Sequence, residues 1–123
     1  MPVIPAVEAV VHELHGTTFT SYAAPSRGSA ELCAWRVEVP AATEGVPHTV
    51  TREEVLCVTS GSARVTLGGE TRDVTTGDVI VVPPGALFGL STGEEAVTAW
   101  VTTSVGLEAT LPDGSTIAPP WTL

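Results

Sequence analysis

The sequence predicts an all-β fold, and three observations support this prediction. Val and Thr, whose branched side chains suit extended backbone, occur 18 times each among the 123 residues. Gly (12 residues) and Pro (10 residues) interrupt the chain at short intervals, as they do in sandwiches and barrels. The pair Gly68-Gly69 separates two strand-like segments, which is a strong signal for a tight hairpin. We therefore expect a single β domain.

Ten segments are predicted to be strands, because each is a short run rich in β-branched or aromatic residues. In chain order they are Phe19–Tyr22, Glu31–Val39, His48–Val50, Glu54–Thr59, Ala63–Leu67, Thr71–Val74, Val79–Val82, Phe88–Leu90, Ala96–Thr103 and Leu107–Leu111. Further turns are predicted at Ser60-Gly61, Thr76-Gly77 and Asp113-Gly114.

The first segment, residues 1–16, fits two interpretations. Val7, Val10, Val11 and Leu14 would form one face of a helix that Gly16 ends. A strand is equally consistent with these residues, because Val is a poor helix former. The sequence alone leaves both open.

Composition and charge exclude several classes of function. The net charge is −9, with five Arg and no Lys, so a nucleic-acid partner is not expected. No apolar run approaches the roughly 18 residues of a membrane span, and the N-terminus lacks the basic region of a signal peptide. Cys33 and Cys57 have no metal-type spacing, which argues against a disulfide framework or a structural zinc site. We expect a cytoplasmic protein with no membrane partner.

Two stretches of the chain resemble the two conserved motifs of the cupin superfamily. The first runs from Gly45 to Gly61 (GVPHTVTREEVLCVTSG), and the second from Gly77 to Thr92 (GDVIVVPPGALFGLST). The matching positions are His48, Glu54, Gly61, Gly77, Pro83 and Gly85. The departures are a shorter interval from Gly45 to His48, Val50 and Phe88 in place of two histidines, and Thr92 in place of an asparagine.

The resemblance implies a double-stranded β-helix, the jelly-roll barrel of cupins, as one domain over residues 1–123. Residues 1–16 would then be an N-terminal arm, which the resemblance favours as a strand packed on a partner subunit. Residues 112–123 would be a tail packed on the barrel, with Trp121 as a plug or, alternatively, at the mouth of a cavity. As is usual for small cupins, a homodimer is expected.

The resemblance also concerns a metal site, because cupins usually bind one metal ion through three histidines and a glutamate. Only His48 and Glu54 occupy such positions here, and both replacements, Val50 and Phe88, are apolar. One imidazole and one carboxylate make a weak site, so we expect no metal and no other cofactor. His12 and His15 are predicted to lie on the exterior, as surface or interface residues.

Strand alternation predicts which side chains face the barrel interior. Residues 48 and 50 share one face, and Glu54, Leu56 and Val58 return to it, whereas Cys57 points outward. His48 and Glu54 are therefore candidate acid and base residues. Candidate ligand-binding residues are Val50, Leu56, Val58, Phe88, Arg36 and Trp100. If Arg36 instead points outward, it is expected to pair with Glu38 or with a neighbouring strand.

Three functions follow as hypotheses. The first is a small-molecule-binding protein without the usual metal site, accessory to small-molecule metabolism. The second is a metal-independent isomerase, lyase or dehydratase that uses His48 and Glu54, and the competing interpretation is that this pair is a relic that only satisfies itself by hydrogen bonding. The third is an atypical metal-dependent oxygenase. The sequence leaves open whether the protein is an enzyme.

Overall fold

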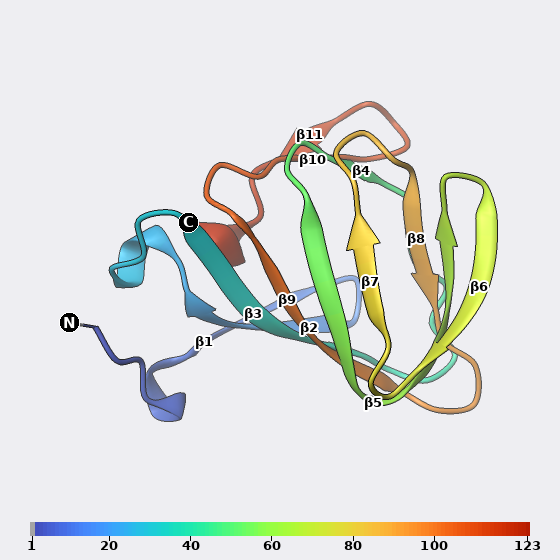
Figure 1. Cartoon of the computed structure of the whole chain (residues 1–123), viewed down its shortest axis with the longest axis horizontal. Helices are drawn as coiled ribbons and strands as arrows, with labels where there is room; N and C mark the ends of the chain where they lie inside the picture. Colours follow the sequence, from blue (N-terminus) through green and yellow to red (C-terminus); the bar gives the residue numbers. More distant parts are fainter. Residues whose placement is uncertain (1) are drawn as a thin grey trace.

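A computed structural model describes residues 2–123, and in this range the chain forms strands joined by turns and short 3-10 helices, with no α-helix (Figure 1). The strands are β1 (Val10–Leu14), β2 (Thr17–Ala23), β3 (Leu32–Val39), β4 (Thr49–Val50), β5 (Glu54–Leu67), β6 (Glu70–Thr75), β7 (Val79–Val82), β8 (Phe88–Ser91), β9 (Val97–Ser104), β10 (Ala109–Thr110) and β11 (Thr116–Ile117). The 3-10 helices are η1 (Ala6–Glu8), η2 (Pro25–Arg27) and η3 (Pro120–Thr122). The all-β prediction is confirmed.

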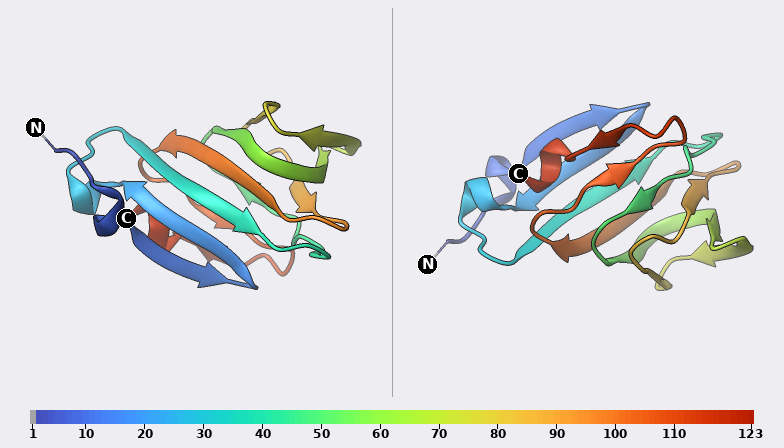
Figure 2. Two further views of the ribbon diagram at one scale, coloured as in Figure 1. Left: turned by 90° about the horizontal axis from the view of Figure 1, so that it is seen from below. Right: turned by 90° about the horizontal axis from the view of Figure 1, so that it is seen from above.

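The strands form two antiparallel sheets. The larger has eight strands in the order β1-β2-β3-β9-β5-β6, with β7 and β8 also paired to β5. The smaller has three strands in the order β11-β10-β4. Figure 1 shows the small sheet across one end of the large one, and Figure 2 shows the large sheet curving around the interior. This arrangement is the jelly-roll barrel that the sequence predicted.

Strand β5 connects the two sides of the barrel, and here the turn prediction was wrong. We expected Ser60-Gly61 to separate two strands, but the backbone continues as one strand of 14 residues. Its first part pairs with β7 and β9, its second part with β6 and β8, and the register on β9 shifts between Val58 and Ser60. This bulge bends the strand, and Gly61 supplies the positive φ of 76°.

The other hairpin and turn predictions agree with the structure. Gly68 and Gly69, with φ of 58° and 86°, form the two-residue turn between β5 and β6. Gly77, with φ of 93°, lies in the turn before β7. The predicted strand Leu107–Leu111 is shorter than expected, since only Ala109 and Thr110 pair.

The N-terminal segment follows the strand alternative. Apart from the 3-10 turn η1, Val10–Leu14 is the strand β1, which pairs with β2 of the same chain. The helical alternative is wrong, because the four apolar residues it needed are distributed over η1 and an edge strand that are largely exposed. Met1 lies outside the described residues. Packing of this segment on a partner, the homodimer and the cytoplasmic location remain predictions.

The C-terminal tail packs on the barrel beside β1 and β2 (Figure 1). The indole of Trp121 stacks on Phe19 with ring centroids 3.7 Å apart and an interplanar angle of 5°. Ser21, which is fully buried, donates its hydroxyl proton to the Trp121 carbonyl oxygen at 2.8 Å. These contacts fix an otherwise short tail against the sheet. Within residues 2–123, no helix has the length and apolar character needed to cross a bilayer.

Candidate functional site

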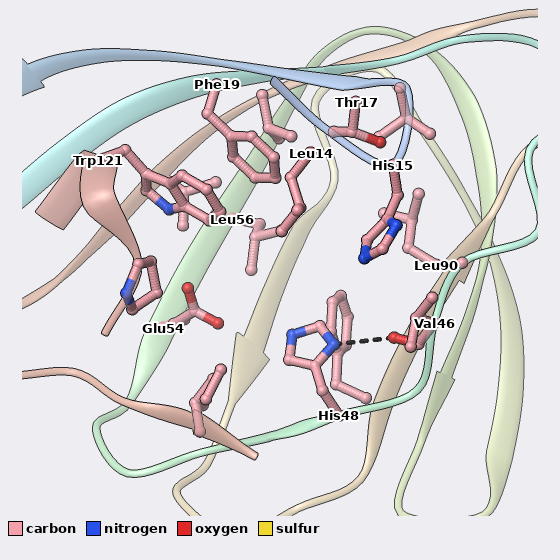
Figure 3. Close-up of a pocket in the computed structure, with 18 of the residues that line it drawn as sticks. Leu14, His15, Thr17, Phe19, Val46, His48, Glu54, Leu56, Leu90 and Trp121 are labelled. Atoms are coloured by element: carbon pink, nitrogen blue, oxygen red, sulfur yellow. Dashed lines mark hydrogen bonds between the residues drawn. The ribbon is translucent and has the colours of Figure 1, made fainter. Parts of the chain in front are cut away.

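A cavity of about 210 Å³ opens between the large sheet and the small sheet (Figure 3). Its walls come from β1 to β5 and β8 to β11, together with the loop before β4 and the tail. Most lining side chains are apolar, and the lining residues with ionisable side chains are His15, Glu44, His48 and Glu54. The cavity is therefore an apolar pocket with a few polar groups, the usual character of a small-molecule site.

Glu54 is the buried ionisable group of this cavity. It begins β5, is 8% exposed and lies near Leu56 and Trp121 at the inner side of the pocket (Figure 3). No side chain in residues 2–123 forms a hydrogen bond or salt bridge with its carboxyl group. Desolvation is therefore unopposed and raises the pKa of Glu54 to about 7. The carboxyl can hold or release a proton near neutral pH.

His48 is oriented by the backbone. Its Nδ1 lies 3.0 Å from the Val46 carbonyl oxygen. A carbonyl oxygen only accepts, so in the neutral ring Nδ1 carries the proton and Nε2 is left as an acceptor. Figure 3 shows that this second nitrogen is on the side of the ring facing Glu54. The predicted pair thus faces one cavity, but the structure has no hydrogen bond between the two side chains within its described residues.

Phe88 lies directly opposite His48. The two residues form an isolated antiparallel bridge, with His48 N to Phe88 O at 2.9 Å and Phe88 N to His48 O at 2.8 Å. Their rings meet edge to face, with centroids 5.8 Å apart at 86°. The fold therefore brings together the two motifs that the sequence singled out, and a phenyl ring occupies the place of a histidine.

The residues do not fit the metal ion that the fold family usually binds. Val50 and Phe88, at two of the four ligand positions, are buried lining residues without donor atoms. Three or more His, Cys, Asp or Glu side chains do not come together as a metal-binding group anywhere in residues 2–123. The remaining imidazole and carboxylate are too few for the shell that first-row metals require.

The other predicted ligand-binding residues divide into two groups. Val50, Leu56 and Phe88 line the cavity. Val58 is buried but lies further along β5, in the packed core, and does not reach the cavity.

Arg36 and Trp100 are on the outer face of the sheet, where they are register partners on β3 and β9. Neither lines the cavity, so the structure does not place them where a cavity ligand would touch them. Arg36 Nε lies 3.2 Å from Glu38 Oε1, as expected for an outward side chain. Trp100 packs against Tyr22, with ring centroids 5.3 Å apart.

Sequence reasoning missed several lining residues, of which His15 is the most important. It is exposed, as expected for a surface residue, but it also lines the cavity from the β1–β2 turn (Figure 3). Phe19 and Trp121 form the aromatic wall, so Trp121 is both the predicted plug and a cavity residue. The pair His15-Gly16 between two β-branched runs was an available hairpin signal. It was interpreted as a possible helix end.

Solved structures with the same fold include several bacterial cupins. The polyketide cyclase RemF from Streptomyces resistomycificus superposes with a TM-score of 0.75 at 21% identity, covering 85% of this chain and 79% of that one. An RmlC-like cupin from Shewanella frigidimarina gives 0.70 at 21% identity, with 80% and 85% covered. KdgF from Halomonas sp. gives 0.67 at 20% identity, with 81% and 90% covered. At these identities the likeness shows the fold alone.

A search among curated proteins finds no matching sequence. Residues 35–103, more than half of the chain, match the family described as Cupin domain. This match includes both motifs, and the barrel described above has the corresponding topology. The chain therefore belongs to the cupin family.

Proposed function

We propose that this protein binds a small, mainly apolar organic molecule in its barrel cavity. The observation that carries the proposal is the cavity itself, because it is lined by apolar side chains and yet contains a buried carboxyl group with no protein partner. The carboxyl oxygens of Glu54 face the cavity and have no side-chain partner in the described part of the chain, so a ligand there can form a hydrogen bond with them. The unpaired carboxyl of Glu54 thus supports a ligand with a polar group.

The cavity volume limits the size of this ligand. An apolar protein cavity of about 150 Å³ is enough to hold benzene. The volume of about 210 Å³ found here therefore suits a single substituted ring or a branched chain of comparable bulk. Phe19 and Trp121 offer aromatic surface, while Glu54 and His48 offer one proton donor and one acceptor that orient the molecule.

A fragment screen by ligand-observed NMR, confirmed by thermal shift, tests this proposal. Ala109→Leu adds three carbon atoms to a lining residue, and Thr110→Leu changes its neighbour, which does not line the cavity. We expect monocyclic fragments to bind, with affinity reduced about tenfold or more by Ala109→Leu and changed less than about twofold by Thr110→Leu. Fragments that bind both variants equally would show that they occupy another place, and the proposal would then fail.

A second candidate function is metal-independent proton transfer, as in an isomerase, lyase or dehydratase. The specific observation in its favour is the pKa of Glu54 near 7, together with the free Nε2 of His48 in the same cavity. A general base is most useful when its pKa lies close to the working pH. Glu54 would remove a proton from a bound substrate, and His48 would donate or accept the second proton.

Solvent exchange distinguishes this candidate from simple binding. A fragment found in the screen is incubated with the protein in D2O, and its C–H signals are followed by NMR. If Glu54 is a base, exchange increases with pH through an inflection near 7 and is lost in Glu54→Gln, while binding is retained. Glu53→Gln, at the exposed neighbouring position, is the matched control. Exchange that survives Glu54→Gln would exclude this role.

A further inference from the structure

His15 has a positive φ, which is uncommon in residues other than glycine. Together with Gly16 it forms the two-residue turn between β1 and β2, in which Leu14 pairs with Thr17. The φ angles of 52° and 79° are those of a type I′ turn, whose preferred first residue is asparagine or glycine. The histidine is therefore not the best choice for the turn itself. Its ring extends from the turn into the cavity mouth, above His48 (Figure 3).

The cavity mouth has a particular set of charged and hydrogen-bonding groups. His15 and His48 are the basic residues among those that line the cavity, and none of the five Arg lines it. The acidic lining residues are Glu44, exposed on the loop before β4, and the buried Glu54. Two imidazoles from separate elements thus line one apolar cavity.

We propose that the ligand is a small carboxylic acid bound as its anion, with the carboxylate between the imidazoles of His15 and His48 and the apolar body against Phe19 and Trp121. This inference rests on the proposed binding function and names its ligand class. An anion beside an imidazole favours the protonated ring, which donates from both nitrogens. His48 then keeps its bond to the Val46 carbonyl and still donates from Nε2.

The acidic groups facing the site are compatible with an anion. Burial raises the pKa of Glu54 to about 7, so below that pH its carboxyl is neutral and donates a proton instead of repelling the ligand. Glu44 is exposed, and solvent screens its charge. We expect Glu44→Gln to strengthen carboxylate binding by less than about threefold, in agreement with the small energies of exposed charge pairs.

The experiment compares two probes of nearly equal shape, para-methylbenzoate and its neutral isostere para-methylbenzamide. Dissociation constants are measured by NMR titration at about pH 6, where Glu54 is mainly neutral, and at about pH 8, where it is mainly ionised and repels an anion. The wild-type protein is expected to bind the carboxylate about tenfold more tightly than the amide at the lower pH, as for one charged hydrogen bond. This preference should decrease at the higher pH.

The decisive variant is His15→Asn, because asparagine suits the first position of a type I′ turn. The fold should be retained, which thermal unfolding verifies, while the preference for the carboxylate drops to about twofold and amide binding is unchanged. His12→Asn is the matched control, since His12 lies on the same hairpin and does not line the cavity; its ring lies 6.4 Å from that of Trp121, which both probes share, so a packing effect there acts on both probes alike. It should keep the full preference.

The outcomes separate this inference from the proposed function. Equal binding of the two probes to the wild-type protein would overturn the anion subsite and leave small-molecule binding intact. A carboxylate preference that His15→Asn does not reduce would overturn the role of His15. If neither probe binds, cavity binding of monocyclic ligands is itself wrong, and the anion subsite falls with it.

Discussion

The barrel has a packed half, in which buried side chains contact one another, and a hollow half, in which they face a cavity. In the packed half, the buried side chains of Val58, Ala63, Val97 and Ala99 belong to one apolar core cluster. In the hollow half, equally buried residues such as Val50, Leu56 and Val101 face a cavity. Strand β5 runs through both, with Glu54 and Leu56 in the hollow half and Val58 and Ala63 in the packed half. The same alternating pattern thus produces either a core or a binding site.

The two halves differ in whether ionisable side chains face their interior. The four buried residues just named in the packed half are all apolar. The hollow half contains Glu54, whose carboxyl lacks a protein partner, and two imidazoles at its mouth. Sites that violate the usual rules of burial are expected to be functional. This difference supports the proposal of a binding site in the hollow half, and the following variants test it.

The largest effect is expected at Gly61, which follows the bulge of β5 and pairs with Val97. A Cβ atom there would overlap the carbonyl oxygen of Ala96, and the positive φ already disfavours any other residue. Gly61→Ala should lower the free energy of unfolding by about 4 kcal/mol or more. Gly16→Ala has a similar φ of 79° but no heavy atom within 4 Å, so it should cost only about 1 kcal/mol. Urea denaturation of both variants gives the comparison, and equal losses would contradict it.

The pH dependence of stability is the next largest effect, and it belongs to Glu54. Its pKa is raised from 4.5 to about 7 in the folded state, so the folded protein binds more protons than the unfolded chain between these pH values. The contribution of Glu54 to the free energy of unfolding is therefore fully present below about pH 4.5, and it is lost as the pH rises through 7. The total loss is about 3 kcal/mol, because one pKa unit corresponds to about 1.4 kcal/mol.

Glu54→Gln removes this titration while keeping the shape of the side chain. The variant should therefore gain stability relative to the wild-type protein as the pH increases from about 4 to about 8, and Glu53→Gln should not. The test is to measure the unfolding free energies of the wild-type protein, Glu54→Gln and Glu53→Gln at about pH 4 and about pH 8. If the unfolding free energy of Glu54→Gln depends on pH in the same way as that of the wild-type protein, the Glu54 carboxyl is solvated or paired.

A matched pair of valines compares the packing of the two halves. Val58 and Val101 are both at most 2% exposed, but only Val101 lines the cavity. Val58→Ala should cost about 2–3 kcal/mol, because its lost methyl groups leave a void among close neighbours. Val101→Ala should cost about 1–2 kcal/mol, since one side of the residue already lacks contacts. Equal costs by chemical denaturation would mean that the cavity wall is packed as tightly as the core.

The same division explains what could be predicted from the sequence. Alternation along β5 assigned Leu56 and Val58 to the interior correctly, because period-two patterning records burial. The alternation did not reveal that Leu56 faces a cavity and Val58 a packed core. That difference depends on which other elements of the fold pack over each residue. His15 was missed for this reason: its turn lies over the cavity only because β1 pairs with β2 and the tail packs beside them. Arg36 and Trp100 were predicted to bind the ligand although strand alternation had not been used to decide which face of the sheet they occupy. Both are on the outer face.

The smallest effect is expected when metal ions are added to or removed from the wild-type protein. Val50 and Phe88 give the hollow half only two of the usual ligand positions, so Mn²⁺, Fe²⁺, Ni²⁺ or Zn²⁺ should change the melting temperature by less than about 1 °C. The double variant Val50→His and Phe88→His adds the two missing imidazoles. It should bind a metal and gain about 2–3 kcal/mol of stability when the ion is present at about a hundred times its dissociation constant. Stoichiometric metal in the purified wild-type protein that is lost in His48→Ala would contradict this expectation. It would make the metal-dependent oxygenase the better hypothesis, because the hollow half would then hold an ion with donors other than those its two motifs supply.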